Sequence, residues 1–318
     1  MYQKGELPQY TDFPEPVVRD ENEVLVTVKA VAIKHLDKGR ASGTHYSSEA
    51  PKECGRIVGG DGVCLLPNGT RVYGMAVTGM LAEKATIYKG RTVNIPDELD
   101  DATAAALPNA IIGAAMGLKF KADIQPGDVV LVNGATGFTG RVAVQIAKHY
   151  GAKKVIVTGR NPQSLHDLLL LGADETVSVL QDDDAFKAQL AAIHANTPID
   201  IIVDYLWGRT AEMILATLKG NGMFTNRVRY VSVGAMTGDL IQLSAANLRS
   251  VDLQLTGSGL GAWSMPQVGK LFSEILPEMY QLAASGKLKV ETIRVKMEDI
   301  AELWDLDVPD GKRLVVTV

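Results

Sequence analysis

Three glycines near the middle of the chain, in the segment GATGFTG, have the spacing of a loop that binds phosphate. They follow a continuous apolar run, DVVLVNG at residues 128–134, and precede a segment of helical periodicity. Glycine lets the backbone turn sharply and approach an anion, and a helix start presents free N–H groups. The spacing is GxxGxxG rather than GxGxxG, so the flanking strand and helix strengthen the prediction. We predict a dinucleotide site formed by Gly134, Ala135, Thr136, Gly137, Phe138, Thr139 and Gly140.

A basic residue stands where the next strand of such a sheet would meet the ribose. It is Arg160, 20 residues past Gly140. An acidic residue there hydrogen-bonds the 2′-hydroxyl of NAD, whereas an arginine accommodates the 2′-phosphate of NADP, which it matches in geometry and charge. We therefore predict NADPH as cofactor, and the alternative is that Arg160 caps a surface turn. The predicted residues at this ribose are Gly159, Arg160 and Asn161.

Strand and helix patterns alternate from about residue 110, which predicts a doubly wound parallel sheet of the Rossmann type. The predicted strands are 128–134, 154–160, 175–179, 199–206, 229–234 and 253–259. A ligand of an open α/β sheet lies across the carboxyl ends of its strands. The other predicted cofactor contacts are therefore at these ends: Asp204, Tyr205, Val233, Gly234, Gly257 and Ser258.

The chain before this sheet has a different residue pattern. Short apolar runs are separated by Gly, Pro, Asn and Asp, as in a mostly β domain. The final segment, GKRLVVTV, is a strand with no helix after it, and we expect it to return to the N-terminal domain. We predict a β-rich catalytic domain of residues 1–108 and 288–318 and a dinucleotide-binding domain of residues 109–287.

Composition argues against other classes of function. The net charge of −5 and the pI of about 5.6 disfavour nucleic-acid and anionic-membrane partners, because no basic surplus is available to neutralise phosphates. No apolar run approaches the ~18 residues that cross a bilayer, and the N-terminus has no signal core. Two cysteines, Cys54 and Cys64, allow neither a disulfide framework nor a four-cysteine zinc lobe. We expect a cytoplasmic protein.

The order of these segments resembles the medium-chain dehydrogenase/reductase superfamily, in particular its zinc-free, quinone-oxidoreductase-like branch. The likeness is carried by EVLVTVKAVAIKHLDKGRASG, VGGDGVCLLPNGTRVYG, AALPNAIIGAA, VNGATGFTGRVAVQIAKHYGA, VDYLWG, VSVGAMTG and the terminal GKRLVVTV. GATGFTG is also similar to the opening of atypical short-chain dehydrogenases, but here more than 130 residues precede it. The resemblance implies a GroES-like catalytic domain and a homodimer formed through the Rossmann sheet.

The family's zinc site can be compared residue by residue. Zinc-dependent members carry a cysteine shortly before an aspartate, where this chain has Lys34 and His35 before Asp37. In the Gly-His-Glu motif, Gly60 replaces the histidine and Asp61 stands for the glutamate. Without a thiolate or imidazole at these positions a tetrahedral zinc cannot be assembled, so we predict no metal. The alternative is a zinc-type alcohol dehydrogenase with relocated ligands, drawn from His35, His45 and Cys54.

The resemblance implies hydride transfer from NADPH to a quinone or an α,β-unsaturated carbonyl, whose conjugation spreads the incoming charge. Candidate hydrogen-bond or proton donors are Lys34, Tyr46 and Asn109. Lys34 contacts the cofactor, polarises the substrate or extends to solvent, and Tyr46 is a proton donor or a wall of the site. Asn109 shapes the pocket, and water is an alternative proton source.

Three further residues have two interpretations each. Arg313 reaches the pyrophosphate or is a surface charge, and Trp207 and Trp263 line the acceptor site or pack in the core. A function of a different class also fits these residues, namely a non-catalytic NADPH-binding redox sensor. Turnover separates the two hypotheses.

Overall fold

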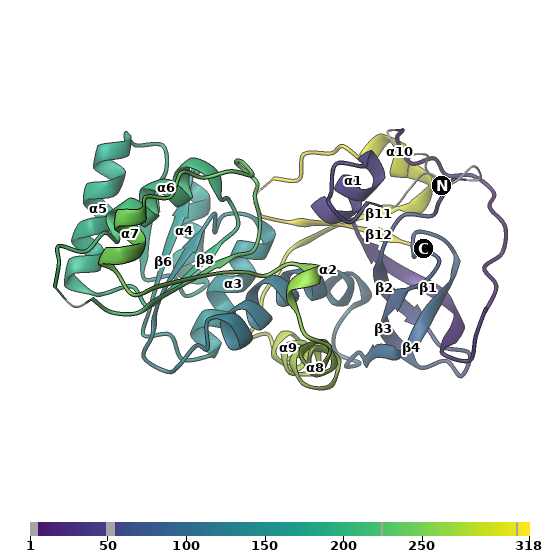
Figure 1. The fold of residues 1–318 in the computed structure, drawn as a ribbon. Coiled ribbons are helices and arrows are strands. Elements are labelled where there is room, and N and C mark those ends of the chain that lie inside the picture. Colours follow the sequence, from purple (N-terminus) through teal and green to yellow (C-terminus); the bar gives the residue numbers. More distant parts are fainter. Residues whose placement is uncertain (1–5, 49–54, 224, 310) are drawn as a thin grey trace. The chain divides into compact units, whose positions relative to one another are not determined.

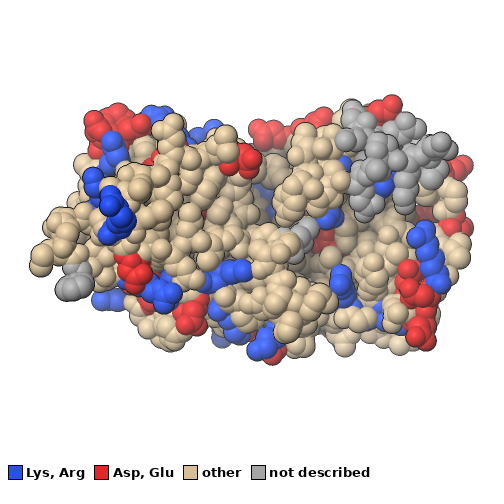
Figure 2. Space-filling view, in the orientation of Figure 1, with Lys and Arg blue, Asp and Glu red and all other residues tan. Residues whose placement is uncertain are grey.

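The computed structural model describes residues 6–48, 55–223, 225–309 and 311–318 (Figure 1). The chain divides into two compact units, Met1–Asn109 with Phe272–Val318 (unit 1) and Ala110–Leu271 (unit 2). Each unit has its own sheet and its own apolar core. On the face shown in Figure 2, acidic and basic side chains are interspersed rather than separated by sign.

Unit 1 is built on a six-stranded sheet of order β11-β12-β1-β2-β3-β4. Strand β1 also pairs with β4, so β1 to β4 close on one another in a strand-rich, GroES-like domain. The strands are β1 Glu23–Ala32, β2 Asp61–Leu65, β3 Arg71–Ala76, β4 Lys84–Asn94, β11 Thr292–Lys296 and β12 Arg313–Thr317. The last strand pairs antiparallel with the first, with Ala30 opposite Thr317. The expected return of the C-terminal strand is thus confirmed.

The helices of unit 1 are short apart from α2, which leads into unit 2. They are α1 His35–Ser42, α2 Asp101–Ile111, α9 Leu276–Ala284 and α10 Ile300–Leu303, with single turns at Leu271–Ile275 (η3) and Met297–Asp299 (η4). The core lies between the sheet and α1, where Val31, Ile87 and Val316 are fully buried. In the first half of β1 buried Val26 and Val28 alternate with exposed Leu25 and Thr27, as expected for a strand with one buried face.

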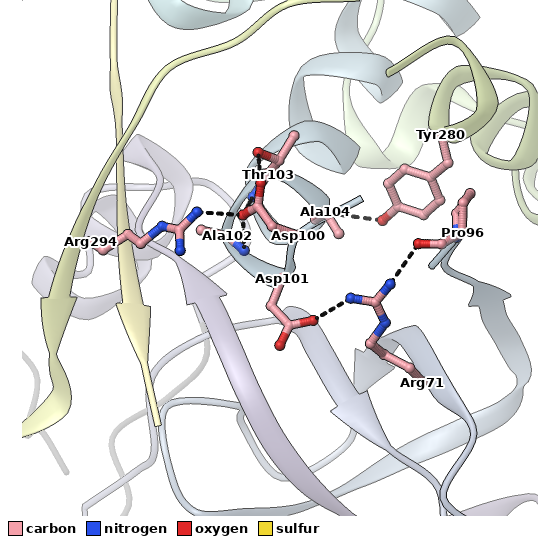
Figure 3. Close-up of polar contacts among 9 residues, drawn as sticks. All are labelled: Arg71, Pro96, Asp100, Asp101, Ala102, Thr103, Ala104, Tyr280 and Arg294. Atoms are coloured by element: carbon pink, nitrogen blue, oxygen red, sulfur yellow. Dashed lines mark hydrogen bonds and ion pairs between the residues drawn. The ribbon is translucent and has the colours of Figure 1, made fainter. Parts of the chain in front are cut away.

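Helix α2 is anchored to unit 1 at its first turn (Figure 3). The Asp100 carboxylate accepts hydrogen bonds from the backbone N–H groups of Ala102 and Thr103, and Arg294 forms an ion pair with it at 2.8 Å. Four residues before Pro108, the Ala104 carbonyl accepts a hydrogen bond of 2.9 Å from the Tyr280 hydroxyl on α9.

This contact places α9 in unit 1, so the second unit ends at Leu271 rather than at the expected residue 287. The prediction placed the helical stretch before residue 287 in the dinucleotide-binding domain because that domain alternates strands and helices. Its packing partner, α2, lies elsewhere in the chain.

Unit 2 is a six-stranded sheet of order β10-β9-β8-β5-β6-β7 in which every neighbouring pair is parallel. The predicted doubly wound Rossmann sheet is therefore confirmed. Its strands are β5 Val129–Asn133, β6 Lys154–Gly159, β7 Glu175–Ser178, β8 Ile201–Asp204, β9 Val228–Ser232 and β10 Leu253–Gly257. Its helices are η1 Ile112–Lys121 (a π-helix), α3 Phe138–His149, α4 Pro162–Leu170, α5 Asp183–Asn196, α6 Gly208–Thr217, α7 Ala245–Ser250, η2 Leu260–Ala262 and α8 Met265–Lys270.

The continuous helix formed by α2 and η1, Asp101–Lys121, is long and apolar enough by composition to cross a membrane. This helix contains no uninterrupted apolar run of its full length, because charged and polar residues lie within it. In the structure 72% of its most apolar window is buried, which is typical of a core helix.

Candidate functional site

The glycine loop joins β5 to the N-terminus of α3. Gly134 has a φ of +81°, which glycine adopts without strain. A side-chain carbon at Gly140 would lie 2.5 Å from the Cα of Ala135, whereas one at Gly137 would meet nothing within 4 Å. No side chain caps α3 at Gly137, and the N-terminus of a helix favours an anion through its dipole. The loop thus has the geometry of a phosphate site.

Hydrogen bonds to β6 hold this loop in place. The Thr158 hydroxyl accepts from the N–H of Gly134 at 3.0 Å and donates to the Asn133 side chain at 2.6 Å. The N–H of Ala135 donates to the Thr158 carbonyl at 2.9 Å. On the helix side, Arg141 donates to the Thr136 carbonyl at 3.3 Å. Thr158 and Arg141 were not predicted from the sequence, and they hold the loop in place by hydrogen bonds to its backbone.

The residues expected at the ribose follow directly after β6. Arg160 is exposed and forms no hydrogen bond or ion pair within the described part of the chain. The methyl of Thr136 packs on Gly159, where an added side-chain carbon would lie only 2.3 Å away. Asn161 is instead the N-cap of α4, because its side-chain oxygen accepts from the N–H groups of Gln163 and Ser164. The Asn161 oxygen is therefore engaged in the fold, and Arg160 is the available charge.

Asp204 lies at the end of β8 as expected, but its carboxylate is turned into unit 2. It accepts hydrogen bonds from Asn133 at 2.7 Å and Tyr230 at 2.6 Å and from the N–H groups of Leu206 and Trp207. Burial raises its pKa while these donors oppose that shift. The side chain is fully buried and organises the turn after β8, and a contact between Asp204 and the cofactor stays a prediction.

The other predicted strand-end residues do gather at the carboxyl edge of the parallel sheet. Val233 and Gly234 follow β9, and both N–H groups donate to the Asp204 carbonyl. Tyr205 follows β8, and a side-chain carbon at Gly234 would lie 2.8 Å from its carbonyl oxygen. Gly257 ends β10 and Ser258 follows it, with its N–H on the Ser232 carbonyl at 2.8 Å. Trp207 packs edge-on against Tyr230, with a ring separation of 6.1 Å. This favours the packing interpretation for Trp207.

Unit 1 contains a second polar group, centred on the buried Lys34 ammonium at the start of α1. It donates to the Asp61 carboxylate and lies 3.3 Å from Asp37 Oδ2. Burial lowers the pKa of Lys34, but the two carboxylates outweigh it and hold the pKa above 10.5. Lys34 is 2% exposed, so it does not extend to solvent. Its charge is committed to the two aspartates.

The aspartates are in turn held by other buried groups. The Tyr73 hydroxyl on β3 donates to Asp61 Oδ2 at 2.9 Å. Arg313 on β12 is 7% exposed and donates to the Ile33 carbonyl at 3.4 Å. Burial lowers the pKa of Arg313 to about 10, and the fields of Asp37 and Asp61 oppose that shift. Arg313 is thus no surface charge, and its contact with a pyrophosphate stays a prediction. Tyr73 was missed because a tyrosine inside a strand carries no signal of its own.

The residues at the family's zinc position do not fit a divalent cation. The Lys34 ammonium already lies against both carboxylates there, and a second cation would be repelled by it. Within the described ranges, no three His, Cys, Asp or Glu side chains are grouped to hold a metal. Of the alternative ligands, Cys54 lies outside the described residues, and His35 is exposed. The buried thiol of Cys64 has its pKa raised to about 12.

The other candidate donors differ in exposure. Tyr46 is 75% exposed and stacks on His45, with a ring separation of 4.2 Å. Asn109 is half-buried near the end of α2, and its side chain forms no hydrogen bond within the described part of the chain. Trp263 lies in unit 2 with the Lys121 ammonium 4.8 Å from its ring centre. The structure therefore leaves Tyr46 and Asn109 available, whereas Lys34 is enclosed.

Comparison with known proteins agrees with this architecture. The Zinc-binding dehydrogenase family matches residues 139–274. A quinone oxidoreductase-like protein 2 homolog of Nematostella vectensis is 27% identical over 278 residues, which is 84% of this chain and 73% of that protein. A polyketide synthase of Streptomyces halstedii is 30% identical over 208 residues, or 64% of this chain, and the chain spans only 4% of its length.

Among solved structures, the quinone oxidoreductase of Thermus thermophilus, determined alone and with NADPH, is similar with a TM-score of 0.75. The two chains are 24% identical, and the match covers 100% of this chain and 99% of that one. The whole chain therefore shares its fold with that protein.

Proposed function

We propose that this chain is a quinone-oxidoreductase-like member of the medium-chain dehydrogenase/reductase superfamily and acts as an NADPH-dependent, zinc-independent reductase of quinones or α,β-unsaturated carbonyls. The observation that carries the proposal is the glycine loop. It leads into the N-terminus of α3, which no side chain caps, and the exposed guanidinium of Arg160 follows the neighbouring strand.

The cofactor preference rests on charge. An exposed arginine at the end of β6 attracts a 2′-phosphate and gains nothing from a 2′-hydroxyl. The Thermus thermophilus relative was solved with NADPH, which supports the same choice. When bound, NADPH supplies a hydride from C4 of its nicotinamide. Residues Gly137–Gly140 would hold its phosphates, and the residues after the strands of unit 2 would bind its nicotinamide half.

The acceptor class follows from the group at Lys34. With an ammonium in the family's zinc position, no metal polarises an alcohol there. A conjugated acceptor needs no such ion, because it delocalises the charge that hydride addition creates. The names of the Nematostella and Thermus relatives support a quinone, and the polyketide synthase match supports an unsaturated thioester as a second acceptor to test.

The proton that follows the hydride comes from Tyr46 or from water in this proposal. Tyr46 is exposed and its hydroxyl forms no hydrogen bond with the described residues, whereas Lys34 is enclosed by two carboxylates. Asn109 carries an amide that donates to the developing enolate oxygen. Lys34 acts as a positioning residue that fixes the start of α1.

The protein in this proposal is a cytoplasmic homodimer. Strand β10 is the edge of the unit 2 sheet, paired only with β9, and Leu255 on it is 37% exposed. An unpaired edge of this kind is a template for pairing with a second copy. Light scattering of the purified chain tests this part.

The decisive experiment is NADPH oxidation by chelator-treated protein against small quinones, enones and an unsaturated thioester. Turnover that survives the chelator supports a metal-free reductase. Activity lost with chelator and restored by zinc contradicts it and favours relocated ligands. NADPH binding without turnover on any acceptor favours the redox sensor.

A further inference from the structure

Two hydroxyl groups at the carboxyl edge of the unit 2 sheet are buried without a hydrogen-bond partner. They are Tyr205 Oη after β8 and Ser258 Oγ after β10, and each residue is 6% exposed. Neither atom meets a donor or acceptor among the described residues. Buried hydroxyls are almost always paired, so an unpaired one requires an explanation. Because both unpaired hydroxyls lie at the same edge of one sheet, we look for one explanation that accounts for both.

Both hydroxyls face the same side of the π-helix η1. A side-chain carbon at Gly113 would lie 3.9 Å from Tyr205 Oη, and one at Gly117 would lie 3.9 Å from Ser258 Oγ. These glycines are four residues apart, about one helical turn, so the two hydroxyls lie along one stripe of the helix. Because glycine has no side chain, the stripe gives neither hydroxyl a polar partner. π-Helical turns are frequent at functional sites.

The strand order shows which part of a dinucleotide would reach this stripe. The phosphate loop follows β5, and Arg160 follows β6 on one side of it. A dinucleotide lies across the strand ends, so with its 2′-phosphate half over β6 its other half extends over β8, β9 and β10. Tyr205 directly follows the first of these three strands and Ser258 directly follows the last. The nicotinamide half therefore comes to the unpaired hydroxyls.

We propose that Tyr205 Oη and Ser258 Oγ bind the carboxamide of the nicotinamide and so fix the orientation of its ring. This inference rests on the proposed function. A carboxamide offers both an acceptor oxygen and a donor nitrogen, and a hydroxyl can serve either. Burial raises the pKa of Tyr205, so its hydroxyl keeps its proton and can donate. The two groups are specificity residues for the nicotinamide half, as Arg160 is for the adenosine half.

The test uses Tyr205→Phe and Ser258→Ala in the full chain, with two readouts. The first is thermal unfolding without nucleotide, with Tyr230→Phe as control, since the Tyr230 hydroxyl does have a partner in Asp204 at 2.6 Å. The second is the Kd for NADPH and for 2′,5′-ADP, which has the phosphates but no nicotinamide. Neither readout depends on turnover.

An unpaired hydroxyl gives effects of opposite sign in these two readouts. Tyr205→Phe should leave the Tm of the free protein unchanged or raise it, whereas Tyr230→Phe should lower it. Both Tyr205→Phe and Ser258→Ala should weaken NADPH by about 3- to 10-fold and leave 2′,5′-ADP unchanged. Unchanged NADPH affinity in both variants overturns the inference, because it means that ordered water satisfies the hydroxyls. An equal loss for both nucleotides overturns it too.

Failure of the proposed function looks different. If the wild-type chain prefers NADH, the 2′-phosphate assignment is wrong, but the same two variants measured with NADH still decide the carboxamide contact. If NADPH binds normally and no acceptor is reduced, catalysis fails while the binding comparison stands.

Discussion

Tyr280 and Ala104 are 176 residues apart in the sequence, and a hydrogen bond of 2.9 Å joins the tyrosine hydroxyl to the alanine carbonyl (Figure 3). In an uninterrupted helix this carbonyl would accept from the N–H of residue 108, but that residue is proline and has none. Tyr280 therefore supplies the donor that Pro108 cannot. Helix α2 continues through the proline, and a side chain from α9 donates the hydrogen bond that the proline cannot.

This pairing predicts a coupling between Tyr280 and Pro108. Tyr280→Phe leaves a buried carbonyl without that donor and should lower the free energy of unfolding by about 1–3 kcal/mol. Pro108→Ala restores a backbone donor, so the same tyrosine change made on top of it should cost much less. Urea unfolding of the four variants measures the coupling. Equal costs in both backgrounds would show that the two residues act independently.

Replacing Lys34 should destabilise the folded protein, because its ammonium neutralises the buried carboxylates of Asp37 and Asp61. Lys34→Met keeps most of the packing volume but leaves two buried carboxylates facing each other, so we expect a loss of about 3–5 kcal/mol. Adding Asp61→Asn should recover part of it. Lys84→Met, which breaks an exposed pair with Glu15, is the matched control and should change stability by less than about 1 kcal/mol. If Lys34→Met unfolds at the wild-type urea concentration, the buried pair does not stabilise unit 1.

The same group gives a pH dependence with a definite sign. Burial lowers the pKa of Lys34, but Asp37 and Asp61 prevail and hold it above the ordinary 10.5. The stabilisation is then fully present below about pH 10.5 and lost as the pH rises through the higher folded-state pKa. The Tm difference between wild type and Lys34→Met should therefore be constant near pH 9 and shrink only above about pH 10.5. A difference that already shrinks between about pH 7 and 9 would contradict the raised pKa.

Arg160→Ala should discriminate between the two nicotinamide cofactors. Removing a guanidinium that pairs with the 2′-phosphate should weaken NADPH by about 10- to 100-fold and leave NADH nearly unchanged. The readout is the Kd of each nucleotide, with Arg227→Ala as a control, since that exposed arginine pairs with Gln254 instead. An equal loss for both nucleotides would show that Arg160 does not contact the 2′-phosphate.

Two glycines of the phosphate loop should respond in opposite ways to alanine. At Gly140 a side-chain carbon would lie 2.5 Å from the Ala135 Cα, so Gly140→Ala should lower the Tm of the free protein. At Gly137 nothing lies within 4 Å, so Gly137→Ala should fold normally. It should nonetheless weaken NADPH, since the phosphates need close access to the backbone there. Normal NADPH affinity in Gly137→Ala would place the phosphates elsewhere.

Local patterns were enough to predict the sheet of unit 2 and its phosphate loop. Apolar runs ending in glycine, each followed by helical periodicity, specify parallel strands because only buried strands are apolar on both faces. The predicted roles of the loop glycines and Arg160 rest on the same kind of local signal, because they depend on backbone freedom and on charge at a fixed distance along the chain. The C-terminal strand was recognisable because no helix follows it.

Only the tertiary structure decided which polar side chains are free to meet a ligand. Lys34 and Asp204 were expected at the site, yet each is also held by a partner far along the chain, Asp61 at 27 residues and Tyr230 at 26. Only the tertiary structure shows that the hydroxyls of Tyr205 and Ser258 are unpaired and that Tyr280 contacts α2. Hydrogen bonds between distant segments leave no periodicity in the sequence, because they depend on where the fold brings each side chain. The sequence alone therefore determined the architecture and the phosphate loop, and the tertiary contacts determined which side chains remain available for chemistry.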